Sequence, residues 1–146
     1  RALAKNGGVM CVNFYSGFIS KEYDQRSSYL NGPGKKVYID SMMQQLHDSA
    51  AVAKAWDTYM DAELQKVRPT LQQLVDHIDY IVKLVGDDYA GIGSDYDGVS
   101  SLPLGMDDVT KYPLITEELK RRGYSDKSIR KILGGNVLRV MKANFR

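Results

Sequence analysis

Two short apolar runs in the sequence predict strands that are buried on both faces. The first, Gly8 to Tyr15, is rich in β-forming residues. The second, Tyr89 to Ser94, contains small or β-branched residues and leads directly into Asp95 and Asp97. Functional groups in parallel α/β proteins commonly lie at the carboxyl ends of strands. Asp95 is therefore the first candidate functional residue.

Between these runs, apolar residues at three- and four-residue steps predict an amphipathic helix from Thr70 to Val85. Thr70 and Gln73 form a capping-box signature at its start, and Gly86 ends it. A strand, a covering helix and a second strand make a β-α-β unit. We expect its strands to be parallel and its crossover to be right-handed.

The remaining pattern is mainly helical. Residues 1–7 are typical of the end of a helix, and good helix formers from Val37 to Val67 predict one long helix. Glycines, a proline and mixed charges between Ser16 and Lys36 predict a long surface loop with a helical turn around residues 22–29.

After the aspartates, the sequence predicts an ordered loop over residues 100–105 and then two helices. Acidic residues at Asp107 and Asp108 and basic residues near Gly123 favour the first helix. Ser125 is a suitable cap for the last helix, which Gly134 and the glycine after it must bend or split.

Composition narrows the classes of function. The chain has 146 residues, 43% of them apolar and 26% charged, and 20 basic and 18 acidic residues give a net charge of +2. Because the charges are mixed and form no basic stripe, nucleic acid is excluded as a partner. No apolar run approaches the ~20 residues that cross a bilayer. The single cysteine, Cys11, precludes an internal disulfide and is predicted to be a buried, inert thiol.

The acidic pair also has simpler explanations. Asp97 and Gly98 form a favoured turn dipeptide, so a purely structural role for Asp97 remains open. A calcium loop of the EF-hand type is disfavoured, because the position of its last glutamate ligand is Met106.

Four motifs occur together in this chain: Val12-Asn13-Phe14-Tyr15, Gly91 to Gly98, Gly105 to Pro113, and Gly134 to Val140. In this order they closely resemble the membrane (renal) dipeptidase family of zinc peptidases. The resemblance covers nearly the whole chain. The exception is the region from about Lys21 to Arg68, which resembles a longer helical insert of the kind that bacterial members carry.

This resemblance implies an α/β fold in which residues 1–146 form the C-terminal portion of a (β/α)8 TIM-like barrel. The two predicted strands would be its last two, and we expect the chain to be a fragment because it begins without methionine and in mid-helix. The family's binuclear zinc ligands are a His-x-Asp pair, a bridging glutamate and two histidines on earlier strands. We therefore expect no metal ligand here, and His47 and His77 are predicted to be structural or surface residues.

Two residues match functional positions of the family. Asp95 matches the aspartate that faces the zinc pair, contacts substrate and handles the proton during peptide cleavage. Phe18 aligns with an aromatic residue that lines the substrate cleft, although packing alone also explains it.

The implied function is a zinc-dependent dipeptidase in which this segment alone is inactive. The alternative is a non-catalytic barrel relative that acts as a binding or structural protein. The implied partners are a dipeptide, the remainder of the barrel and a second copy in a homodimer. The resemblance leaves the compartment open between the bacterial cytoplasm and the cell envelope.

Overall fold

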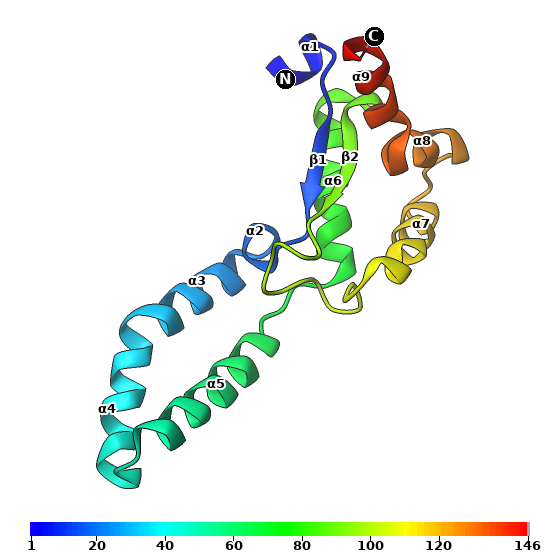
Figure 1. Ribbon diagram of the computed structural model, residues 1–146. Coiled ribbons are helices and arrows are strands. Elements are labelled where there is room, and N and C mark those ends of the chain that lie inside the picture. The colour runs from blue at the N-terminus through cyan, green and yellow to red at the C-terminus, as the bar shows by residue number, and fades with distance from the viewer. Residues whose placement is uncertain (146) are drawn as a thin grey trace.

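The computed structural model describes residues 1–145 and consists of a body and a long helical arm (Figure 1). The arm comprises α3, α4 and α5; the body contains both strands and the other helices. The elements are α1 (Ala2–Lys5), β1 (Met10–Asn13), α2 (Ser16–Ile19), α3 (Lys21–Tyr29), η1 (Leu30–Gly34), α4 (Lys35–Leu46), α5 (Ser49–Gln65), α6 (Leu71–Val85), η2 (Asp87–Tyr89), β2 (Ala90–Ser94), η3 (Val109–Lys111), α7 (Tyr112–Arg121), α8 (Asp126–Arg130), η4 (Lys131–Gly135) and α9 (Asn136–Asn144).

The two strands pair in parallel, as predicted, and they form a two-stranded sheet in the described residues. Val12 pairs with Ile92, but the next residue, Asn13, pairs with Ser94. The register therefore shifts by one residue and passes over Gly93. A Cβ atom at Gly93 would lie 2.9 Å from the Val12 carbonyl oxygen, so the two backbones come this close only because residue 93 has no side chain.

Helix α6 provides four of the thirteen buried core residues, more than any other element. It begins where the sequence predicts, with a capping box in which the Thr70 hydroxyl accepts from the Gln73 amide and the Gln73 side chain accepts from the Thr70 amide. Its apolar face packs against residues of the strands, α7, α8 and η4. The buried cluster contains Val12, Phe14, Ile19, Leu74, Val75, Ile78, Ile81, Ala90, Met106, Ile115, Leu119, Ile129 and Ile132.

A partly buried ion-pair network joins α6 to the end of α7. The Arg122 guanidinium donates to Glu118, Asp76 and Asp79 at 2.6–2.7 Å and to the Gln72 carbonyl at 2.8 Å. Hydrogen bonds from Arg121, and then from Arg122, hold the pKa of Glu118 at about 2 against the opposing effect of burial. Because this pKa is depressed, Glu118 contributes stability above its ordinary pKa, and this contribution is lost as the pH falls toward 2.

The last helix is tied to the start of β2 by one buried side chain. The Asn136 amide donates to the carbonyls of Asp87 and Ala90 at 2.7 and 2.8 Å. Ser125 caps α8 as predicted, and the predicted split lies at η4, where Gly134 departs from helical geometry. The motif from Gly134 to Val140 thus serves to hold the second strand in place.

Two predictions for the arm are wrong. The long surface loop expected after Ser16 is wrong, because this stretch is mostly helical and the helix breakers are confined to residues 32–34. The helical turn expected around residues 22–29 is present as α3, which starts where the Ser20 hydroxyl accepts from the Tyr23 amide. The expected long helix is instead a pair, α4 and α5. It is interrupted at His47, which adopts a left-handed conformation with φ 51°, and Asp48 then caps α5.

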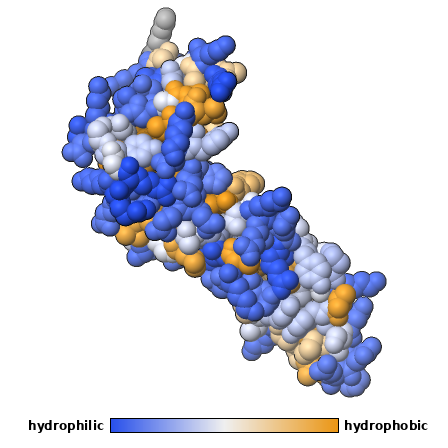
Figure 2. All heavy atoms as spheres, turned by 180° about the vertical axis from the view of Figure 1, so that it is seen from behind, coloured by the Kyte–Doolittle hydropathy of each residue, from blue (hydrophilic) through white to orange (hydrophobic). Residues whose placement is uncertain are grey.

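The prediction of a buried Cys11 is also wrong, because its thiol is exposed. In the described residues β1 has β2 as its one neighbour, so its other edge is open, and Met10 beside Cys11 is 54% exposed. On the face of the molecule opposite to the view of Figure 1, Figure 2 shows apolar patches among mostly polar residues. No helix in residues 1–145 is both long enough and apolar enough to span a membrane.

We predict that Arg122→Ala in the complete protein lowers the free energy of unfolding by about 3 kcal/mol, because it removes the mostly buried guanidinium that bridges Glu118 on α7 to Asp79 on α6. The Arg122 side chain is 14% exposed and that of Glu118 is 5% exposed. The control is Arg121→Ala: this side chain is 66% exposed, and its loss should cost less than about 1 kcal/mol. Urea unfolding measures the free energy of unfolding of both variants. Equal decreases in the two variants would contradict the larger role assigned to Arg122.

Candidate active site at the ends of the strands

The carboxyl ends of both strands bring two polar side chains together. Asn13 is the last residue of β1, and Asp95 follows the last residue of β2. The Asn13 amide nitrogen donates to Asp95 Oδ2 at 2.9 Å, although the two residues are 82 positions apart in the sequence. The exposed Asp95 carboxylate therefore lies at the carboxyl end of its strand, as the sequence predicts. Its hydrogen-bond partner, Asn13, was not predicted.

Asp95 and Phe18, the two predicted site residues, line one small cavity. Its volume is about 330 Å³, and its other lining residues are Tyr15, Gly98, Val99 and Ser100. Phe18 is 68% exposed and packs edge-on against the Tyr15 ring at a centroid distance of 5.1 Å. An exposed aromatic ring beside a carboxylate suits a ligand that has both an apolar and a charged or polar part.

Asp97 lies in the turn that follows Asp95. It is exposed, and the turn is closed by the Gly98 amide, which donates to the Asp95 carbonyl at 3.1 Å. Asp97 does not line the cavity that Asp95 and Phe18 share. This placement is compatible with the structural role that the sequence left open, which remains a prediction.

Arg68, at the base of the arm, fixes the loop beside the site. Its guanidinium donates to the carbonyls of Leu102 and Pro103 at 2.9 and 3.3 Å and to the Asp107 carboxylate at 2.7 Å. The Leu104 amide donates to the Pro69 carbonyl at 2.8 Å. The loop over residues 100–105 is thus ordered, and its anchor comes from the end of the arm.

An aromatic cluster supports the turn from the core side. The rings of Phe14, Tyr96 and Tyr112 meet edge to face at centroid distances of 5.8–6.2 Å. Burial raises the pKa of Tyr96 to about 12, so its hydroxyl stays protonated at neutral pH. That hydroxyl is buried without a hydrogen-bond partner among residues 1–145.

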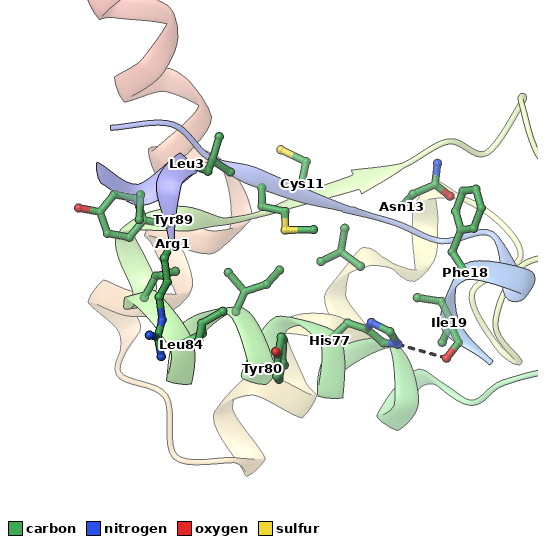
Figure 3. A pocket seen from close by; sticks show the side chains of 15 residues that line it. Arg1, Leu3, Cys11, Asn13, Phe18, Ile19, His77, Tyr80, Leu84 and Tyr89 are labelled. Carbon is green, nitrogen blue, oxygen red and sulfur yellow. Dashed lines mark hydrogen bonds between the residues drawn. The ribbon is translucent and has the colours of Figure 1, made fainter. Parts of the chain in front are cut away.

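A larger apolar groove of about 480 Å³ runs between β1 and α6 (Figure 3). His77 lies in its wall and contacts the Ile19 carbonyl oxygen through Nε2 at 3.1 Å. His47 lies at the exposed tip of the arm, between α4 and α5. Both histidines occupy structural or surface positions, in agreement with the sequence-based prediction.

The side chains of residues 1–145 do not bring three or more His, Cys, Asp or Glu groups together as a metal site. Asp95 has an amide and an aromatic ring as neighbours instead of further ligands. The donor set of this chain therefore does not fit a resident metal ion by itself.

The family model for membrane dipeptidase, peptidase family M19, matches residues 1–145. The chain belongs to this family. The dipeptidase verJ of Clonostachys rogersoniana is 49% identical over 73 residues, which are 50% of this chain and 19% of that protein. The dipeptidase aclJ of Aspergillus oryzae is 35% identical over 121 residues, which are 82% of this chain and 28% of that protein.

The fold agrees with that of a bacterial relative. The crystal structure of the probable dipeptidase PvdM from Pseudomonas aeruginosa matches with a TM-score of 0.59 and 30% identity, over 91% of this chain and 36% of that one. The family resemblance of the four motifs is thereby confirmed. The chain spans between 19% and 28% of the length of the two curated relatives described above. These relatives come from fungi and PvdM from a bacterium, and a bacterial type for this chain remains a prediction.

Members of the M19 family are dipeptidases and metallopeptidases, and membership implies a metal cofactor.

Sequence reasoning missed two residues at the site, Asn13 and Arg68. A single polar residue within the apolar run of β1 was the available signal for Asn13. Arg68 gave no such signal, because its contacts with the loop are 34 to 39 residues away.

We predict that Arg68→Lys loosens the loop over residues 100–107, since lysine cannot reproduce the forked contacts of the guanidinium. Amide hydrogen exchange in the complete protein should accelerate at Leu104 and Met106. In the unsubstituted protein the Leu104 amide donates to the Pro69 carbonyl and the Met106 amide donates to the Pro103 carbonyl. Asp107→Asn is the matched control, because it keeps both carbonyl contacts of Arg68. Unchanged exchange in Arg68→Lys would show that the loop is held by other contacts.

Proposed function

We propose that the complete protein is a zinc-dependent dipeptidase and that this segment supplies Asp95 to its active site. The observation that carries the proposal is the Asp95 carboxylate beside the exposed Phe18 ring at the strand ends, in a chain of the membrane dipeptidase family. The substrate we propose is a dipeptide. A homodimer and a location in the bacterial cytoplasm or envelope remain predictions.

The proposed architecture is a (β/α)8 barrel in which β1 and β2 are the last two strands. Three features support it: the strands are parallel, α6 connects and covers them, and the open edge of β1 leaves apolar residues exposed. In such a barrel the active site lies at the carboxyl face of the strands, which is where Asn13 and Asp95 lie. The partner that covers the edge of β1 is then the remainder of the barrel.

Zinc bound in such a site would polarise the scissile carbonyl of the substrate and lower the pKa of a water molecule. The zinc ligands would come from other parts of the polypeptide, because residues 1–145, which the structure describes, bring no ligand set together. Asp95 would accept a proton from the water molecule that attacks the scissile carbonyl carbon, and would return it to the amine nitrogen as the peptide C–N bond breaks. A carboxylate that is exposed to the cavity and held by one hydrogen bond is suited to this transfer.

Phe18 is the proposed contact for a side chain of the dipeptide. Its ring is exposed on one side and supported by Tyr15 on the other, so it presents a fixed apolar surface toward the cavity. Tyr15 itself lies between Asn13 and Phe18 and lines the same cavity.

The direct test is hydrolysis of a panel of dipeptides by the complete protein, with zinc supplied and after chelation. We expect activity with zinc, loss of activity on chelation, and neither activity nor stoichiometric zinc binding in a polypeptide of residues 1–146 alone. A complete protein that contains the upstream His-x-Asp, glutamate and histidine ligands, yet cleaves no dipeptide, would instead favour the non-catalytic relative.

We predict that Asp95→Asn lowers kcat by about 10²- to 10⁴-fold while zinc content is retained, because asparagine keeps the size of aspartate and cannot carry the proton. Asp97→Asn is the control, since asparagine is also a good turn residue and most activity should remain. The measurements are kcat and bound zinc for both variants. Near-normal turnover in Asp95→Asn would refute the assignment, and a larger loss in Asp97→Asn would transfer the role to Asp97.

A further inference from the structure

The side chain of Asn13 is fixed at both of its polar atoms. Its Oδ1 accepts from the Tyr15 backbone amide at 2.7 Å, and its Nδ2 donates to Asp95 Oδ2 at 2.9 Å. A backbone N–H can only donate, so the oxygen end of the Asn13 amide must face Tyr15. The orientation of this amide is therefore determined, and its NH2 group must face the carboxylate.

The backbone after β2 adopts an uncommon conformation that brings the carboxylate to this donor. Ser94 and Asp95 have φ angles of 51° and 84°, in a region that residues with side chains seldom occupy. The shifted register sets Asn13 opposite Ser94, and the Phe14 amide donates to the Ser94 carbonyl at 2.8 Å. The strained turn is thus tied to the end of β1 by one backbone bond and one side-chain bond.

The other carboxylate oxygen rests against Gly98. A Cβ atom at position 98 would lie 2.1 Å from Asp95 Oδ1, which shows that this oxygen occupies the space a side chain would take. Asp95 is therefore held between the Asn13 amide on one side and the Gly98 backbone on the other. Oδ2 is engaged by Asn13, and Oδ1 has no hydrogen-bond donor among the described residues.

We propose that Asn13 is a positioning residue for Asp95: it engages Oδ2 and so leaves Oδ1 as the oxygen that accepts and returns the proton. This inference rests on the proposed function of Asp95. Asn13 acts through the carboxylate and does not itself contact the cavity that Asp95 and Phe18 line. Its removal should therefore matter only while residue 95 can carry a proton.

A double-mutant cycle in the complete protein tests this dependence. Asn13→Ala should lower kcat by about 10- to 100-fold with little change in KM, as is typical when a partner that orients a functional group is removed. The same substitution in an Asp95→Asn background should cause no further loss. Asn31→Ala, at an exposed asparagine on the arm, is the matched control and should leave kcat unchanged.

Asn13→Asp separates the two bonds of Asn13, because it keeps the acceptor for the Tyr15 amide but lacks the donor to Asp95. We expect it to lose as much turnover as Asn13→Ala. Activity close to that of the unsubstituted protein would show that only the Tyr15 bond matters and would overturn the proposal. An equal loss from Asn13→Ala in both backgrounds, or a rise in KM alone, would also overturn it.

A structural measurement distinguishes failure of this inference from failure of the proposed function. If the unsubstituted complete protein hydrolyses no dipeptide, the proposed function fails, and crystal structures of that protein and its Asn13→Ala variant then decide the positioning role. We expect the Asp95 carboxylate to leave its place against Gly98 or to occupy several rotamers in the variant. An unmoved, single conformation would refute the role of Asn13.

Discussion

The close approach of β1 and β2 at Gly93 is the constraint on which the site depends. A side chain at residue 93 would meet the Val12 backbone, so the strands would have to separate. Separation would lengthen the bond between the Phe14 amide and the Ser94 carbonyl, and with it the one between Asn13 and Asp95. The geometry of the carboxylate is therefore set by the absence of a side chain two residues before it.

The arm is connected to the site through its base. Its helices pack mostly on one another, with Trp56 and Val52 buried between them. Immediately after α5, however, Arg68 binds two loop carbonyls and Asp107, and this loop leads back to the turn that contains Asp95. A long segment between a strand and its covering helix is thus anchored next to the site, and the contacts of Arg68 help to offset the entropy cost of ordering the loop over residues 100–107.

Local signals in the sequence predicted much of the body, and they failed where distant contacts decide. Helix α6 was predictable because its capping box and its helical repeat of apolar residues both lie within one stretch of sixteen residues. The division of the arm at His47 was missed because alanine and glutamine outweighed the capping signal of Asp48. The contact of Asn13 with Asp95 depends on a register shift between strands 82 residues apart, and no local pattern encodes such a shift.

The motifs that reveal the family serve the scaffold more than the chemistry. Asn136 holds the start of β2, Gly93 admits the neighbouring strand, and Asp108 caps the turn before α7 through the Thr110 amide at 2.7 Å. A substitution at Asn136 would release β2 from α9 and so displace the strand ends, whatever their chemistry. Loss of activity is informative about the reaction only at positions such as Asp95, where the side chain faces the cavity and the core lies elsewhere.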